Sequence, residues 1–235
     1  MPKGFIFDYG GTIDTRGCHW GKKIWHTYED ALIPVSEEHY RDAYVFVERT
    51  LGKNPVIQPS YTFKKTLETK LQLQLNYLED QKLFAKPVLI DRCKNVLLER
   101  LYRDVCDTVK ESKRVLEKLS LHYPLVLVSN FYGNIGVVLK EFALDGLFKN
   151  VIESAVVGVR KPDSRIFTMG VDALDMNAED VVVVGDSYSK DIVPAVKAGC
   201  KAVWIKGEGW TDEPYDETFP ERVIDSLDEL LNCYL

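Results

Sequence analysis

Four short apolar runs mark the chain, within the segments GFIFDYGG (4–11), YPLVLVSN (123–130), DVVVVGDS (180–187) and KAVWIKG (201–207). Runs of this length that are rich in branched side chains and end in glycine or a polar residue predict strands. Because their apolar residues follow one another without alternation, both faces of each strand should be covered. The pattern therefore predicts an α/β fold, a doubly wound parallel sheet with helices on each side.

Apolar residues at helical spacing fill most of the remaining chain. Between the later strands, helices are predicted over residues 109–121, 162–175 and 188–200, and a last helix over 223–235. The stretch from 15 to 106 lacks clear strands, and its periodicity predicts helices over 21–32, 36–52, 61–84 and 88–105. We therefore expect a core of residues 1–14 and 107–235, interrupted by an all-helical domain of residues 15–106.

Composition narrows the class of protein. Of the 235 residues, 46% are hydrophobic and 28% charged, which is typical of a globular protein. With 30 basic and 36 acidic residues and no basic stripe, we expect no nucleic-acid partner. No apolar run approaches the ~20 residues that span a bilayer, and no signal peptide is recognised, so no membrane association is expected. Five scattered cysteines without a CxxC pair indicate reduced thiols and a cytoplasmic location.

Polar residues stand where the apolar runs end. Ligands of open α/β sheets bind at the carboxyl ends of the strands, which directs attention to Asp8, Ser129 and Asp186. Two carboxylates that converge there repel each other unless a cation joins them, and hard oxygen ligands suit Mg²⁺. Ser129 and Lys161 can donate hydrogen bonds to a phosphate, and the glycine turn at 10–12 lets backbone amides approach an anion. The pattern indicates a magnesium and phosphate site.

The segments DYGGT (8–12), VSN (128–130), RKP (160–162) and GDSYSKD (185–191), in this order, resemble the motifs of the haloacid dehalogenase (HAD) superfamily of hydrolases. Most members are Mg²⁺-dependent phosphatases, and the helical stretch 15–106 resembles the cap that closes over their active site and selects the substrate. The resemblance implies a phosphatase that acts on a small phosphorylated metabolite.

The resemblance also implies a role for each matching residue. Asp8 would be the nucleophile that forms an aspartyl-phosphate, and the catalytic set would include Ser129 and Lys161 as ligands of the transferring phosphoryl group. The metal ligands would be Asp8, the carbonyl of Gly10 and Asp186. Gly11, Thr12 and Asn130 would complete the phosphate-binding set. Asp191 would not bind the metal directly but would hold Lys161 or a metal-bound water in place.

The chain departs from the family at Gly10, where phosphatases of this kind usually carry a second aspartate as general acid and base. Loss of such a group typically costs ~10²–10⁴ in rate. Three explanations remain open: a leaving group that needs no proton, such as an acyl phosphate or an enolate; a substitute acid among Tyr9, Asp14, His19 and His26; or a weak or inactive relative.

Two alternatives act at carbon instead of phosphorus. The dehalogenase branch also lacks the second aspartate but works without metal, whereas GDSYSKD keeps the metal-site acids, which favours phosphate. The phosphonatase branch uses a cap lysine, for which Lys22 and Lys23 are candidates. A further alternative is a binding protein that keeps the fold with little activity. The oligomeric state is expected to be a monomer or a homodimer, and Trp20 and Trp25 are predicted to pack inside the cap.

Overall fold

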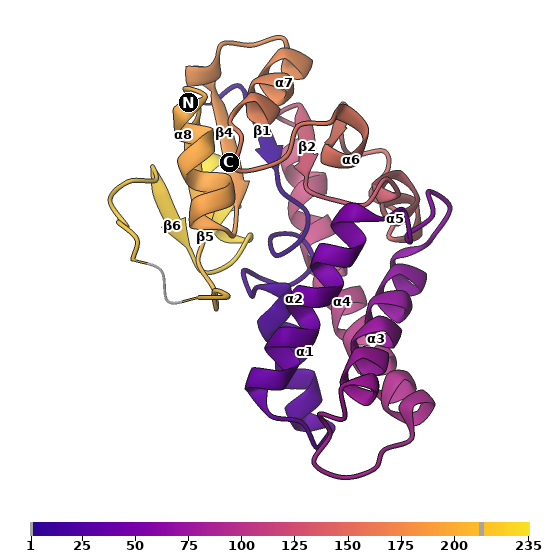
Figure 1. Ribbon diagram of the computed structural model, residues 1–235. Helices are drawn as coiled ribbons and strands as arrows, with labels where there is room; N and C mark the ends of the chain where they lie inside the picture. Colours follow the sequence, from indigo (N-terminus) through magenta and orange to yellow (C-terminus); the bar gives the residue numbers. More distant parts are fainter. Residues whose placement is uncertain (1, 212–213) are drawn as a thin grey trace.

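A parallel sheet of six strands forms the centre of the computed structural model, which describes residues 2–211 and 214–235 (Figure 1). Its strand order is β3-β2-β1-β4-β5-β6, and every neighbouring pair is parallel. The strands are β1 (Gly4–Phe7), β2 (Leu125–Ser129), β3 (Asn150–Glu153), β4 (Val181–Gly185), β5 (Lys201–Ile205) and β6 (Arg222–Ile224). The predicted α/β class is confirmed.

The four predicted strands are β1, β2, β4 and β5, whereas the two edge strands were not predicted. β3 and β6 are only four and three residues long, and each begins with a polar residue and is partly exposed. The last predicted helix, over 223–235, is wrong in its first part. That part begins within β6, and only Glu229–Tyr234 (α9) is helical. A short edge strand carries too few apolar positions to be told from an amphipathic helix by pattern.

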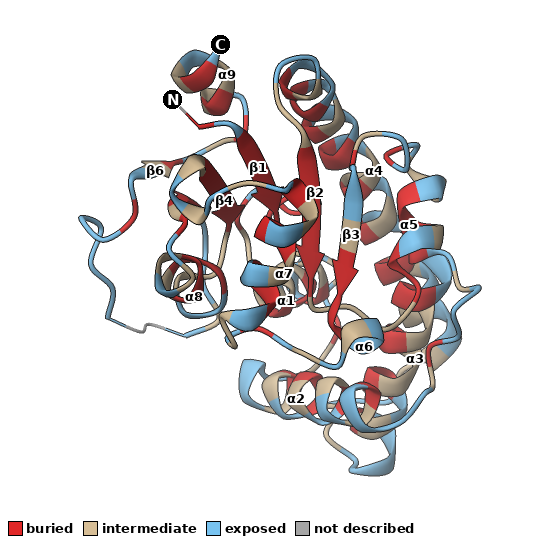
Figure 2. Ribbon diagram, turned by 90° about the horizontal axis from the view of Figure 1, so that it is seen from above, coloured by how far each residue is buried: buried red, intermediate tan, exposed pale blue. Residues whose placement is uncertain are grey.

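Helices cover both faces of the sheet (Figure 2). Phe5 and Phe7 of β1 point to one face and pack with α4 (Ile90–Ser120), α5 (Ile135–Glu141) and α9. Ile6 points to the opposite face and packs with α7 (Arg165–Leu174) and α8 (Val193–Lys197). This alternation, with no polar residue inside the strand, explains the unbroken apolar runs of the sequence. Two short elements, α6 (Ser154–Val157) and a 3₁₀ turn, η1 (Ala178–Asp180), complete the core.

The insert between β1 and β2 is helical, as predicted, and consists of α1 (Trp20–Asp30), α2 (Glu37–Lys53), α3 (Phe63–Asp80) and the first part of α4 (Figure 1). We call this part the cap. Ser36 and Thr62 begin α2 and α3 by accepting hydrogen bonds from backbone amides three residues on. The buried side chains of the cap are continuous with one core cluster of the sheet.

A single helix of 31 residues, α4, replaces the two helices predicted over 88–105 and 109–121. No glycine or proline separates those stretches, and the apolar stripe continues through Val105 and Val109, so nothing stops the helix between them. At 1.5 Å per residue α4 is roughly 46 Å long and belongs to both the cap and the core. The boundary expected at residue 106 therefore lies inside a helix.

Core residues hold the cap at several points. Asn134 donates hydrogen bonds of 2.8 Å to the Tyr61 carbonyl and the Thr66 hydroxyl, and Glu141 accepts from the backbone amides of Phe63 and Lys64 at the start of α3. These contacts join the loop and helix after β2 to α3, so the cap is closed over the strand tips.

A second link comes from the loop after β5. Trp210 packs 4.8 Å from Tyr44 between ring centroids, its carbonyl accepts a 3.0 Å hydrogen bond from Arg41, and its indole fills the space beside Gly21. The sequence indicates a solvated loop over 210–221; two of its residues, 212 and 213, lie outside the described residues, but Trp210 is half-buried against the cap. None of the described helices has the length and apolar character to cross a membrane.

Candidate active site

Asp8 and Asp186 lie side by side at the tips of β1 and β4. Asp8 follows β1 directly, is 4% exposed, and its amide donates a 3.0 Å hydrogen bond to the Val184 carbonyl. The Thr12 hydroxyl lies 3.2 Å from both Asp8 Oδ2 and Asp186 Oδ1, and its single proton can serve one of them at a time. Adjacent strands at the point where the strand order reverses thus bring together residues 178 positions apart.

Lys161 joins this pair from the loop before α7. Its ammonium donates to Asp8 Oδ1 and, at 2.6 Å, to Asp191 Oδ1, and it is 5% exposed. Burial disfavours the charged form, but Asp191 and Asp8 outweigh burial and keep the pKa of Lys161 above its usual value. Asp191, in the π-helical turn η2 (Tyr188–Ile192), also accepts a 3.0 Å hydrogen bond from the Ser187 amide, which fixes its orientation.

Asn130 and Ser129 lie at the end of β2. Asn130 forms two hydrogen bonds with the backbone of Lys161: its Oδ1 accepts from the Lys161 amide at 3.0 Å and its Nδ2 donates to the Lys161 carbonyl at 3.1 Å. Its side-chain amide is therefore committed to positioning Lys161, although Asn130 also lines the pocket. Ser129 is 1% exposed and lines the same pocket.

The cluster carries more negative than positive charge. Carboxylate oxygens of Asp8, Asp186 and Asp191 all lie within 4.8 Å of one another, against the one ammonium of Lys161. Burial, assisted by Asp191, raises the pKa of Asp8 to about 6, and burial together with the two neighbouring carboxylates raises the pKa of Asp186. A buried set of oxygen donors with excess negative charge suits a hard divalent cation such as Mg²⁺.

Gly11 makes the close approach of Asp186 possible. Its φ is +105°, a conformation that favours glycine, and a Cβ at this position would overlap the Asp186 carboxylate. The amide of Gly11 donates a 2.7 Å hydrogen bond to Asp14, which holds the turn. The glycine therefore allows the Asp186 carboxylate to lie directly against the turn that follows β1.

We expect Gly11→Ala to lower the free energy of unfolding by about 2–4 kcal/mol and to reduce activity, because it adds backbone strain and displaces Asp186. Gly133→Ala is the matched control, since Gly133 has a φ of +95° but no atom within 4 Å of the added Cβ. Thermal denaturation of both variants separates strain from overlap. Equal losses in the two variants would show that the overlap with Asp186 has no cost.

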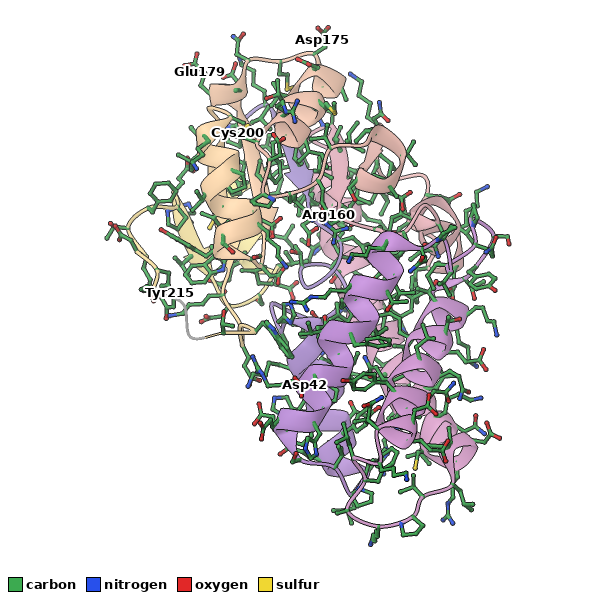
Figure 3. The ribbon with its side chains drawn as sticks, viewed as in Figure 1. Asp42, Arg160, Asp175, Glu179, Cys200 and Tyr215 are labelled. Atoms are coloured by element: carbon green, nitrogen blue, oxygen red, sulfur yellow. The ribbon has the colours of Figure 1, made fainter. Side chains whose placement is uncertain are left out.

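The strand tips and the cap together enclose a pocket of about 160 Å³. The predicted site residues that line it are Asp8, Gly10, Ser129, Asn130, Lys161, Asp186 and Asp191. Gly11 and Thr12 are buried beneath it. Figure 3 shows Arg160, a further lining residue, where the core meets the upper end of the cap helices.

Three of the four candidate substitute acids lie away from the pocket wall. Tyr9 is fully buried against Phe131, and its hydroxyl has no hydrogen-bond partner among the described residues. Asp14 is also buried, and burial raises its pKa to about 7. His26 is half-exposed on α1, where its Nε2 lies 2.6 Å from Glu208.

His19 alone of the four lines the pocket. Its Nδ1 accepts a 3.0 Å hydrogen bond from the Gly21 amide at the start of α1, so the ring proton sits on Nε2. Burial, followed by the charge of Lys190, lowers the pKa of His19 to about 4. A neutral imidazole held in this tautomer can donate a hydrogen bond but is a poor source or acceptor of a catalytic proton near pH 7.

Trp20 occupies the space beyond Gly10. A Cβ on Gly10 would lie 3.9 Å from Trp20 Cδ1 and Nε1, and the indole N–H donates a 3.0 Å hydrogen bond to Asp14. The two tryptophans of α1 thus differ: Trp25 packs on Tyr40 inside the cap, as predicted, whereas Trp20 also lines the pocket. Beyond Gly10, the pocket wall is therefore formed by the Trp20 indole.

Several pocket residues were not predicted. Glu48, Lys70 and Tyr132 line the pocket from α2, α3 and the loop after β2, and Arg160 and Lys190 are exposed cations at its wall. Lys70 lies between Leu67 and Leu71 on the buried face of α3, and this charge within an apolar stripe was the available signal. Lys22 and Lys23, the candidates for a phosphonatase lysine, do not line the pocket; they pair with acidic side chains.

Solved structures of the same fold cover almost the whole chain. A dehalogenase structure with an intermediate complex aligns with 99% of this chain and 96% of its own, with 19% identity and a TM-score of 0.62. YfnB from Bacillus subtilis, described as a HAD-hydrolase and bound to magnesium, covers 99% of this chain and 98% of its own, with 18% identity and a TM-score of 0.59. At these identities the likeness shows the fold.

Curated relatives match parts of the chain. The glyceraldehyde 3-phosphate phosphatase of Methanocaldococcus jannaschii is 29% identical over 153 residues, which cover 65% of this chain and 64% of that protein. The phosphoserine phosphatase of Thermus thermophilus is 35% identical over 83 residues, or 35% of this chain and 32% of that protein. The chain thus spans between 32% and 64% of the length of these two relatives.

The family described as haloacid dehalogenase-like hydrolase matches residues 42–205. The matched region begins inside α2 and ends with β5, so it includes Ser129, Lys161 and Asp186, while Asp8 precedes it. Since the match covers more than half of the sequence and the sheet has the fold of the solved relatives, this chain belongs to the haloacid dehalogenase-like hydrolases.

Proposed function

We propose that the protein is a Mg²⁺-dependent phosphohydrolase that acts on a small phosphorylated compound through an aspartyl-phosphate intermediate. The observation that supports this most strongly is the cluster at the strand tips, where oxygens of Asp8, Asp186 and Asp191 lie within 4.8 Å of one another beside the pocket and Lys161 donates to two of these acids. The curated relatives named above are phosphatases of a triose phosphate and of phosphoserine, which supports a small substrate.

In this proposal the Asp8 carboxylate attacks phosphorus, and the bond from phosphorus to the leaving oxygen breaks. Water then attacks the aspartyl-phosphate and releases inorganic phosphate, which restores Asp8. Ser129 and Lys161 bind the phosphoryl oxygens, with the Thr12 amide nearby, whereas the Gly11 amide is used by Asp14. Asn130 holds the backbone of Lys161, and Asp191 holds its ammonium group.

The proposed metal ligands are Asp8, Asp186 and the backbone carbonyl of Gly10, and the donor chemistry of the cluster fits Mg²⁺. Bound there, the ion would offset the charge of the phosphoryl oxygens that Asp8 must approach. We also propose a cytoplasmic location, because the five cysteines are free thiols.

A test of this function is phosphate release from acetyl phosphate and from a panel of small phosphate esters, with Mg²⁺ or with EDTA. We expect Mg²⁺-dependent release that is strongest for acetyl phosphate, because no general acid replaces the missing aspartate. Chloride release from 2-haloacids that is insensitive to EDTA would instead favour the dehalogenase alternative. Binding of Mg²⁺ without turnover of any compound would favour a protein of little activity.

Magnesium binding has a readout independent of turnover. At a concentration one hundred times its dissociation constant, Mg²⁺ should stabilise the fold by about 2.7 kcal/mol, which corresponds to a rise in Tm of about 5–10 °C for a domain of this size. Asp186→Asn should abolish this rise without lowering the Tm of the metal-free protein, because burial already disfavours the Asp186 charge. Asp42→Asn, at an exposed site on α2 (Figure 3), should keep the full rise. A rise that persists in Asp186→Asn would contradict the assigned ligand.

A further inference from the structure

A polar cluster on the cap side of the pocket consists of Glu48 of α2, Lys70 of α3 and Tyr132 of the loop after β2. Lys70 Nζ lies 2.6 Å from Glu48 Oε1 and donates a 3.2 Å hydrogen bond to the Tyr132 hydroxyl, which donates a 2.9 Å hydrogen bond to Glu48 Oε2. All three residues line the pocket that contains Asp8. The catalytic steps proposed above use none of them.

This cluster is poorly explained as a stabilising device. Lys70 is 8% exposed, and a buried ion pair generally contributes no more stability than apolar residues of the same volume, because both charges lose their water. The neighbours of Lys70 on the same face of α3, Leu67 and Leu71, show that the cap core accepts leucine there. A charged triad at a pocket wall is thus better explained by a ligand.

The cluster retains hydrogen-bonding capacity. Lys70 has three N–H donors, and the contacts above use two of them. The Glu48 carboxylate has about four acceptor positions, and its contacts with Lys70 and Tyr132 use two of them. A donor and an acceptor are therefore available side by side at the pocket wall.

The charges of the cluster decide which ligand group fits. Glu48 and Lys70 cancel each other, so the cluster itself carries no net charge. A carboxylate would meet Glu48 as closely as Lys70, and an ammonium would meet Lys70 as closely as Glu48, whereas a hydroxyl or carbonyl group meets no such repulsion. A hydroxyl can donate to Glu48 and accept from Lys70 at the same time.

The volume of the pocket limits the length of the ligand. A water molecule needs roughly 10–15 Å³ of such space, so about 160 Å³ accommodates on the order of ten non-hydrogen atoms. A phosphate group takes up about half of these, which leaves room for a chain of three carbons with its oxygens. We propose that the cluster of Glu48, Lys70 and Tyr132 binds an uncharged hydroxyl- or carbonyl-bearing tail of a short phosphorylated substrate. This inference rests on the proposed phosphohydrolase function and names the substrate class for the same site.

The test measures inhibition constants, because these do not depend on how readily a leaving group departs. Acetyl phosphate hydrolysis is followed while glycerol 3-phosphate or propyl phosphate competes; the two inhibitors share a three-carbon chain and differ in hydroxyl groups. We expect glycerol 3-phosphate to bind at least tenfold more tightly than propyl phosphate. In Tyr132→Phe and in the double variant Glu48→Gln/Lys70→Met, this ratio should fall to within threefold of unity.

The choice of variants and one control make the outcome decisive. The double variant removes both charges together, so that no unpaired charge remains to unfold the cap, and Tyr132→Phe removes only a hydroxyl. Lys65→Met breaks the exposed Lys65–Glu68 pair of the same helix and should keep the tenfold ratio. A ratio near unity in the unaltered protein, or a ratio unchanged in both cluster variants, would overturn the inference while leaving the phosphohydrolase function intact. Tighter binding of phosphoserine or of 3-phosphoglycerate than of glycerol 3-phosphate would also overturn the inference, because it would show that the cluster binds a charged tail. Absence of acetyl phosphate hydrolysis would instead reject the function on which it rests.

Discussion

Asp8→Asn is expected to reduce phosphate release by ~10³-fold or more, because an amide cannot attack phosphorus in place of the carboxylate. The fold should persist. Burial raises the pKa of Asp8 from 3.8 to about 6, so the folded state loses stability as the pH rises from 3.8 to about 6, and the full cost of the ionised carboxyl remains above that pH. Asparagine removes this cost at pH 7, and Lys161 keeps Asp191 as its partner. The Tm should therefore be equal to or higher than that of the unaltered protein.

The measurement is steady-state phosphate release from acetyl phosphate together with thermal denaturation. Asp163→Asn is the control, since Asp163 pairs with Arg165 in front of α7 and does not line the pocket. It should retain full activity. An Asp8→Asn variant that keeps a tenth or more of the activity would show that another group attacks phosphorus.

Gly10→Asp, combined with Trp20→Gln to make room for the new carboxyl group, is expected to accelerate hydrolysis of alkyl phosphates by ~10²-fold or more and of acetyl phosphate only a few-fold, since only the alkoxide needs a proton as it leaves. The Cβ itself meets only ordinary contacts, 3.9 Å from the indole of Trp20. The carboxyl group beyond it needs the space that the indole fills. The gain should therefore be small in the single variant and full in Gly10→Asp/Trp20→Gln, in which the shorter side chain keeps an N–H group for Asp14.

The control for this pair is Gly10→Asn/Trp20→Gln, which has the same shape without an acidic proton. Turnover numbers for glycerol 3-phosphate and acetyl phosphate are compared in the four proteins. If aspartate and asparagine accelerate equally, or if both substrates gain equally, the general acid is not what the natural active site lacks.

The strand tips could be predicted from the sequence because their signals are local. An apolar run followed by a polar residue places Asp8, Ser129 and Asp186 at one edge of a parallel sheet, and the structure brings these tips together. What could not be predicted is the partner of each side chain, such as the use of the Asn130 amide on the backbone of Lys161.

The cap side of the pocket depends on how helices pack, which one sequence does not reveal. Periodicity locates α2 and α3 but not which of their turns face the strand tips, so the sequence does not single out Glu48 or Lys70. Trp210 is a similar case: it follows a glycine-containing loop, and its contact with Tyr44 arises because Gly21 leaves room for the indole.

The unbroken course of α4 limits how the two halves of this enzyme can be recombined. Near residue 106 the helix passes from one half to the other without interruption, so a hybrid cut there would leave two exposed half-helices, each without its buried partners. A cap transplanted from another protein would keep its shape only if that protein supplied all of α4 through Ser120, with the other junction placed before Trp20. The natural unit of exchange is therefore longer than the part of the insert that lines the pocket.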